Sequence, residues 1–136
     1  MHKMKIFIGI LALVVLMGFT NKTYSQSAPV MYFCEKYDGG EVGISDRFTT
    51  GYLTVMVKCD YALGLTDVTI QFDKFNCNTN KFDYYKDFPY SVSADMKYIY
   101  FASKDLNFDK PGVFRVYLLN SSRQTVASAL IEIVSK

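Results

Sequence analysis

Hydrophobic and polar residues alternate along much of the chain. Residues 52–59 place Leu53, Val55 and Val57 on one face of an extended segment, and residues 68–73 repeat the pattern. Alternation with a period of two, carried by many β-branched residues, predicts strands that bury one face. Seven segments predict strands from this pattern or from apolar and aromatic runs: 30–36, 52–59, 68–73, 90–93, 97–102, 113–119 and 125–134.

Turn residues separate these segments. Residues 37–51 contain four glycines and predict a long loop, residues 107–112 end in Pro-Gly and predict a turn, and residues 120–123 predict a hairpin connection. The alanines within 125–134 would also suit a helix, but the preceding hairpin and the β-branched end favour a strand. We therefore expect an all-β fold, a single antiparallel β-sandwich of about seven strands, because one sheet of this size would leave an apolar face in water.

The first 25 residues differ from the rest. A short basic start, Met1–Lys5, precedes a run without charge, Ile6–Phe19, and a polar stretch that includes Ser25. This order is typical of a secretory signal peptide with cleavage after Ser25, and the apolar run is shorter than the roughly 20 residues that a membrane-spanning helix needs. The junction resembles signal peptides of Gram-negative bacteria whose mature chains start with Gln. The alternative is an uncleaved N-terminal anchor.

Removal of the signal peptide changes the charge of the chain. The full chain has 15 basic and 13 acidic residues, a net charge of +2. Because three lysines and no acid lie in residues 1–25, the mature domain, 26–136, carries 12 bases and 13 acids, a net charge of −1. Its bases are scattered singly, whereas a nucleic-acid surface needs them clustered. We expect a periplasmic or secreted domain that binds no nucleic acid and has no stable membrane span.

The chain contains one histidine, His2, which lies in the predicted signal peptide. The mature domain therefore lacks imidazole, which excludes Ser-His-Asp and Cys-His nucleophilic catalysis and zinc sites built with histidine. The sequence also has no Walker loop, no Gly-rich dinucleotide turn and no Cys-x-x-Cys or Ser-x-x-Lys motif. We expect neither enzyme activity nor a cofactor.

Residues 108–118, Phe-Asp-Lys-Pro-Gly-Val-Phe-Arg-Val-Tyr-Leu, resemble the Pro-Gly-x-aromatic-x-Val start of the penultimate strand in immunoglobulin-like and fibronectin-type-III-like domains. Residues 125–134 then resemble the closing strand of these domains. The resemblance covers about the last 40 residues and implies an immunoglobulin-like sandwich, without the buried Trp of antibody domains. It implies no function, because such sandwiches have many unrelated roles. The last 30 residues also resemble C-terminal sorting domains of secreted bacterial cargo.

Three cysteines, Cys34, Cys59 and Cys77, lie in the mature domain, and export would place them in a compartment that permits disulfides. If the first three strands run in alternate directions, Cys34 and Cys77 lie near the same end of the sandwich and Cys59 lies near the other. A Cys34–Cys77 bond is then the easiest pairing. The alternative is three reduced and mostly buried thiols.

Two polar stretches need testing as cation sites. Residues 76–87 have oxygen-bearing side chains at a spacing like that of a calcium loop, but the early positions are amides and Lys81 replaces the required glycine. Turn chemistry explains the asparagines better, because Asn tolerates left-handed conformations. A diffuse acidic stretch, with Glu35, Asp38, Glu41 and Asp46, crosses the long loop. Glycoside hydrolysis needs paired carboxylates across a defined cleft, for which a sandwich of this size offers little room. A solvated loop is the favoured interpretation, and a weak calcium or partner contact is the alternative. We expect no metal site.

The most distinctive patch is residues 81–90, which contain five aromatic residues interleaved with charge. These residues are Phe82, Tyr84, Tyr85, Phe88 and Tyr90. One interpretation is a crossover whose rings cover an open edge of the sandwich. The other is an exposed binding platform, since tyrosine combines a large contact area and a hydroxyl with low entropic cost.

The platform interpretation leads to two functional hypotheses. The first is an exported, non-catalytic module that contacts another envelope or secreted protein, as an accessory subunit or as an inhibitor or immunity-type factor. The second is a small carbohydrate-binding module with a Tyr-rich platform, against which the absence of Trp counts. Tyr98 and Tyr100 share one face of their strand and would either extend the platform or belong to the core.

Overall fold

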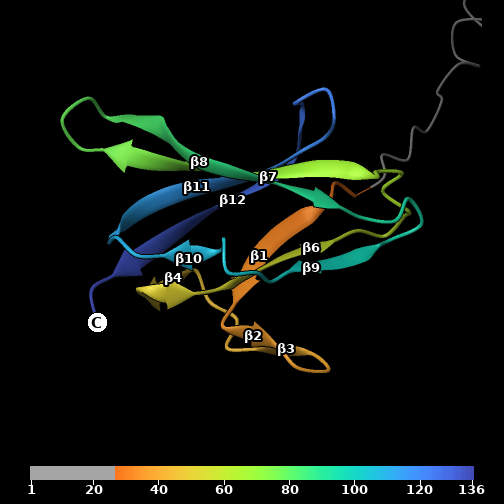
Figure 1. The fold of residues 1–136 in the computed structure, drawn as a ribbon, viewed down its shortest axis with the longest axis horizontal. Helices are drawn as coiled ribbons and strands as arrows, with labels where there is room; N and C mark the ends of the chain where they lie inside the picture. Colours follow the sequence, from red (N-terminus) through yellow and green to blue (C-terminus); the bar gives the residue numbers. More distant parts are fainter. Residues whose placement is uncertain (1–26) are drawn as a thin grey trace, which may run out of the picture.

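The structure is a computed structural model that describes residues 27–136 (Figure 1). The predicted signal peptide and its cleavage after Ser25 lie outside these residues. The described part of the chain is all-β, as predicted, and contains no helix long and apolar enough to cross a membrane. Its strands are β1 (Val30–Cys34), β2 (Lys36–Tyr37), β3 (Glu41–Val42), β4 (Arg47–Thr49), β5 (Gly51–Tyr52), β6 (Thr54–Lys58), β7 (Asp67–Asn76), β8 (Lys81–Ser91), β9 (Tyr98–Phe101), β10 (Asn107–Phe108), β11 (Gly112–Leu119) and β12 (Thr125–Val134).

Two main sheets lie one above the other in Figure 1. The smaller has the strand order β1–β6–β9, and the larger has the order β4–β12–β11–β7–β8. Two short pairs, β10–β5 and β2–β3, are attached to them, and the β2–β3 hairpin lies on the far side of the smaller sheet (Figure 1). Within residues 27–136, seven strands have four or more residues, and each of these seven belongs to one of the two main sheets.

The apolar faces of the two sheets meet in one hydrophobic core. Val55 and Val57 of β6 and Ile70 and Phe72 of β7 are completely buried, as the alternation of the sequence predicts. Residues on β9, β11 and β12 complete the core from both sheets. This arrangement buries one face of each sheet and is a β-sandwich.

The C-terminal hairpin follows the prediction closely. β11 and β12 pair along their length, and the segment with an Ala-rich centre is a strand. In the connecting turn, the Asn120 side chain accepts hydrogen bonds from the backbone N–H groups of Ser122 and Gln124 at 3.0 and 2.9 Å. Arg123 takes the left-handed conformation that closes the turn, with φ of 58°. The Asn side chain therefore substitutes for backbone partners within the turn.

Most of β8 is missed by the sequence pattern. The pattern predicts a strand only at 90–93 and irregular structure over 77–87, whereas β8 starts at Lys81 and is the longest strand described. A β-bulge at Tyr85, where the pairing with β7 shifts register, interrupts the alternation in mid-strand. Lys86 then faces inward, where an apolar residue is expected. The prediction of a short strand here is therefore wrong.

The sandwich is also not purely antiparallel. β4 pairs with β12 in parallel, whereas every other strand pair within residues 27–136 is antiparallel. Figure 1 shows β1 and β4 running the same way, with the β2–β3 hairpin between them. The loop expected at 37–51 therefore carries the chain from one sheet to the edge of the other without reversing it. This continuity explains why β4 meets β12 in parallel.

Candidate binding surface

The predicted aromatic patch lies on β8, which is an edge strand of the larger sheet. The bulge divides its side chains between two faces. Tyr85, Phe88 and Tyr90 are partly buried and pack against the core. Phe82 and Tyr84 lie on the outer face of the sheet. The five residues therefore do not form one continuous platform.

The inward rings of β8 cover the open edge of the sandwich. Each contacts a core phenylalanine, with centroid distances of 5.6 Å for Tyr85–Phe114, 6.4 Å for Phe88–Phe72 and 5.3 Å for Tyr90–Phe101. The Tyr85 hydroxyl donates to Asp109 Oδ1 at 3.1 Å, and the hydroxyl oxygens of Tyr90 and Ser103 are 2.8 Å apart. Burial raises the pKa of both tyrosines. These contacts give Tyr85 and Tyr90 a structural role in closing the sandwich.

Lys86, the residue after the bulge, also holds β8 against the open edge of the sandwich. Its Nζ donates to the backbone oxygens of Asn107 and Asp105 at 2.7 and 3.3 Å. The same atom lies between 5.4 and 5.8 Å from the ring centroids of Phe72, Tyr85, Phe88 and Phe108. Burial lowers the pKa of Lys86, since a desolvated ammonium is disfavoured, and the negative charges of Asp109 and Asp105 oppose that shift. The segment around β10 is thereby tied to β8.

The outer side of β7, β8 and β11 carries a different group of side chains. Phe75 and Phe82 are cross-strand partners with centroids 5.2 Å apart, and the guanidinium carbon of Arg115 lies 5.1 Å from the Phe82 centroid. Arg115 Nε is buried and has no hydrogen-bond partner within the described residues. Tyr84 follows Phe82 by two residues on the same face of β8, and it is 61% exposed. We call Phe75, Phe82, Tyr84 and Arg115 the aromatic face.

A polar network adjoins the aromatic face and orients its exposed ring. The Tyr84 hydroxyl donates to Asp87 Oδ1 at 3.1 Å, and Asp87 forms an ion pair with Arg123 at 3.3 Å. Arg123 also donates to Gln71 Oε1 at 3.0 Å, and Gln71 donates to Asp73 at 2.9 Å. Such exposed pairs add little stability, but they restrict the rotamers available to Tyr84. A ring that is already positioned loses less entropy when it binds a partner.

A second tyrosine cluster, which the sequence does not predict, lies on the opposite side of the molecule. Tyr98 and Tyr100 are on the outer face of the smaller sheet, so they do not extend the aromatic face. Tyr37 of β2 stacks on Tyr100, with centroids 4.4 Å apart and planes 8° apart. Glu41 of β3 accepts a hydrogen bond from Tyr32, and hydrogen bonds from Tyr32 and Tyr98 lower the pKa of Glu41. This cluster fastens the β2–β3 hairpin to the sheet.

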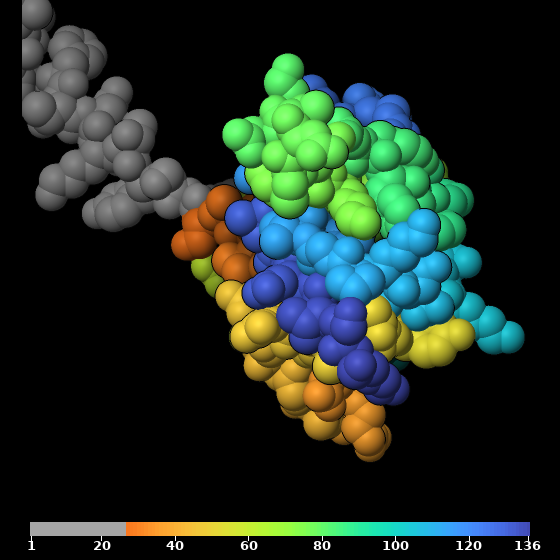
Figure 2. Space-filling model, turned by 90° about the vertical axis from the view of Figure 1, so that its left-hand side faces the viewer, coloured from red at the N-terminus to blue at the C-terminus, as the bar shows by residue number. Residues whose placement is uncertain are grey.

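The three cysteines are free thiols in the structure. Cys34 and Cys59 are buried, and Cys77 is exposed in the turn between β7 and β8. Figures 1 and 2 show this green turn on the opposite side of the molecule from the orange β2–β3 hairpin that follows Cys34. The expected Cys34–Cys77 bond is not formed: Cys34 is buried at the end of β1 in the smaller sheet, and Cys77 is exposed in a turn of the larger sheet.

The polar stretch after β7 forms a turn. Asn76 accepts the backbone N–H of Asn78 on its side chain at 2.9 Å and that of Asn80 on its carbonyl at 2.8 Å. Asn80 is left-handed, with φ of 56°. Nowhere in residues 27–136 do three or more His, Cys, Asp or Glu side chains gather closely enough to hold a metal ion.

Comparisons of the chain with protein-family models, with curated proteins and with solved structures found no match. The function of the chain is therefore inferred from its own surfaces.

Proposed function

We propose that the chain is an exported, non-catalytic immunoglobulin-like module that binds another envelope or secreted protein through the aromatic face. Its role would be that of an accessory subunit or of an inhibitor or immunity-type factor. The strand order supports the immunoglobulin-like assignment. Among the seven longer strands, the first, second and fifth share one sheet, and the other four share the second sheet. In constant-type immunoglobulin domains the first, second and fifth strands also share one sheet, and the third, sixth and seventh share the other. The fourth strand lies with the first, second and fifth in those domains and in the other sheet here.

The observation that carries the proposal is the composition of the aromatic face. Tyr, Phe and Arg are enriched at protein interfaces, and Tyr and Arg dominate the residues whose truncation costs most binding energy. Tyr84 offers an exposed ring, and Arg115 offers a guanidinium that lies over the Phe82 ring. These features favour a protein partner.

The charge pattern around the face also suits a specific protein contact. Asp73, Asp87 and Arg123 surround Tyr84 with both signs of charge. Mixed charges at the rim of an aromatic centre select among partners more than they add affinity. A nucleic-acid surface would instead need a run of positive charge.

The proposal is tested by affinity capture from an envelope extract with three forms of the protein. Wild type and Tyr52→Ala should retain the same partner, whereas Tyr84→Ala should lose most of it. Tyr52 is a matched control because it is 64% exposed, against 61% for Tyr84, and lies on β5 away from the aromatic face. Equal capture by all three forms would contradict the proposal.

A panel of polysaccharides in native gels tests the carbohydrate alternative with the same variants. No shift is expected with any form. A shift of wild type and Tyr52→Ala that disappears in Tyr84→Ala would make a glycan the ligand of the aromatic face. That result would replace the protein partner in the proposal and leave the location of the site unchanged.

A further inference from the structure

Two strand edges border the open side of the sandwich, and only one is protected against pairing with another strand. β8, the edge of the larger sheet, has a bulge at Tyr85, an inward lysine at Lys86 and a proline at Pro89. Bulges, inward charges and prolines are the devices by which proteins prevent an edge strand from pairing with another chain. The remaining edge is β9 of the smaller sheet.

β9 lacks these devices. Its sequence, Tyr-Ile-Tyr-Phe, contains no charge, proline or glycine, and its pairing with β6 is regular. The Cys59 backbone N–H donates to the Lys97 carbonyl at 2.7 Å, so antiparallel alternation directs the backbone groups of Ile99 and Phe101 toward β6. The N–H and C=O groups of Tyr98 and Tyr100 therefore face the free edge. No backbone partner occupies that edge within the described residues.

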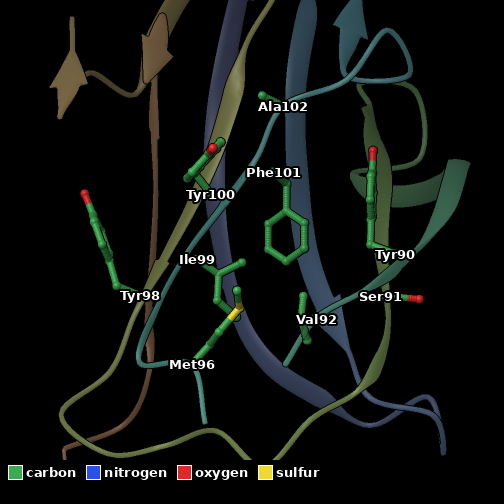
Figure 3. A pocket seen from close by; sticks show the side chains of 9 residues that line it. All are labelled: Tyr90, Ser91, Val92, Met96, Tyr98, Ile99, Tyr100, Phe101 and Ala102. Carbon is green, nitrogen blue, oxygen red and sulfur yellow. The ribbon is translucent and has the colours of Figure 1, made fainter. Parts of the chain in front are cut away.

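An apolar cleft of about 340 Å³ lies directly beside this edge. Figure 3 shows Tyr90 and Val92 on one side of it and Met96 and Ile99 on the other, with the Phe101 ring between them. None of the residues that line the cleft is charged. A strand added beside β9 would place every second side chain over this cleft, because side chains alternate across a strand.

We propose that the free edge of β9 accepts an extended, uncharged segment of a partner protein as an added strand, with alternate apolar side chains of that segment in the cleft. The four free backbone groups of β9 require donors and acceptors at the spacing of a polypeptide strand, which a glycan does not present. This surface is separate from the aromatic face, because its free edge belongs to β9 of the smaller sheet and its cleft is lined only by the last two residues of β8, Tyr90 and Ser91, whereas Phe82 and Tyr84 lie near the start of β8.

A second copy of the chain is a poor occupant of this edge. Ile99 and Phe101, the inward residues of its own β9, are 5% and 4% exposed and cannot leave their core to fill the cleft. Paired β9 strands would contribute four residues from each copy, whereas a stable interface takes about 20 to 30. An extended segment of a different protein can supply both the backbone pattern and free apolar side chains.

The test uses phage-displayed random ten-residue linear peptides, selected on the full chain, and measures the selected peptides on three variants. Tyr100→Pro removes one outward N–H and blocks the approach of a strand, yet proline is tolerated where the N–H faces away from the sheet. Tyr100→Thr removes the same ring and keeps the N–H. Met96→Lys places a charge at the cleft, at a site that is 38% exposed and outside β9.

The expected peptides alternate apolar and polar residues and contain no proline in their centre. Their affinity should fall at least tenfold on Tyr100→Pro and on Met96→Lys and should stay within threefold on Tyr100→Thr. Thermal unfolding of each variant verifies that the fold is intact, and Met96→Lys decides the test if Tyr100→Pro fails to fold. Selection of no peptide, or peptides that bind all folded variants equally, would overturn the proposal.

Discussion

Tyr84 and Tyr85 are neighbours in sequence, and the bulge gives them opposite surroundings. Tyr85→Ala removes a ring that packs on the buried Phe114, together with its hydrogen bond to Asp109. Truncation of a fully buried aromatic residue costs about 3 to 5 kcal/mol, and an aromatic pair adds about 0.5 to 1.5 kcal/mol. Because Tyr85 is only partly buried and its hydrogen bond is exposed, we expect a loss of about 2 to 3 kcal/mol.

For a domain of this size, that loss lowers the melting temperature by roughly 8 to 12 °C. Tyr84→Ala should leave the melting temperature unchanged, because its ring contacts solvent and its hydroxyl bond is exposed. Thermal unfolding followed by circular dichroism, with wild type and Tyr85→Phe as references, measures the difference in melting temperature. Tyr85→Phe keeps the ring and should lose only a small part of the stability. Equal stabilities of the two alanine variants would refute the two-sided arrangement of β8.

Further predictions concern a carboxylate, the thiols and a glycine. The pKa of Glu41 is lowered in the folded state, so its contribution to stability is complete above its ordinary pKa of 4.5 and is lost as the pH falls through the lower folded value. Glu41→Gln should therefore be less stable than wild type at pH 7 and should approach it under acid, and a constant difference would contradict this. Alkylation of the native protein should modify the exposed Cys77 and spare the buried Cys34 and Cys59. After unfolding without a reductant, all three thiols should react. Fewer than three reactive thiols would reveal a disulfide. Gly112→Ala should cost about 1 to 3 kcal/mol in urea unfolding, because φ is 151° there and L-residues rarely adopt that conformation.

The parts of the fold that follow from the sequence are those with regular alternation. The alternation in β7 and β11 indicates which of their residues are buried, and the Asn-Ser-Ser-Arg turn before β12 is recognisable as a hairpin connection. β8 escapes prediction because a bulge is a property of strand pairing, and the one-residue register shift at Tyr85 has no signature in the residues themselves. The inward position of Lys86 is a consequence of the same shift.

Only two of the four residues of the aromatic face can be predicted from the sequence, because strand pairing also determines the other two. Phe82 and Tyr84 are recognisable as members of an aromatic run. Phe75 and Arg115 join them only because β8 pairs with β7 and β7 with β11 in a particular register. That register places Arg115, far along the chain, against the Phe82 ring. The same limit applies to Tyr37, whose stacking on Tyr100 depends on where the β2–β3 hairpin docks.

Photocrosslinking in living cells tests most directly whether the aromatic face binds a protein. A photoreactive benzoylphenylalanine is placed at position 84 in one form and at position 52 in another, because the two tyrosines are equally exposed on different surfaces. If the aromatic face binds a protein, position 84 should give one dominant protein adduct that position 52 does not give. Arg115→Ala, introduced together with the photoreactive residue at position 84, should abolish that adduct. No protein adduct from position 84, or the same adducts from both positions, would contradict the proposed function.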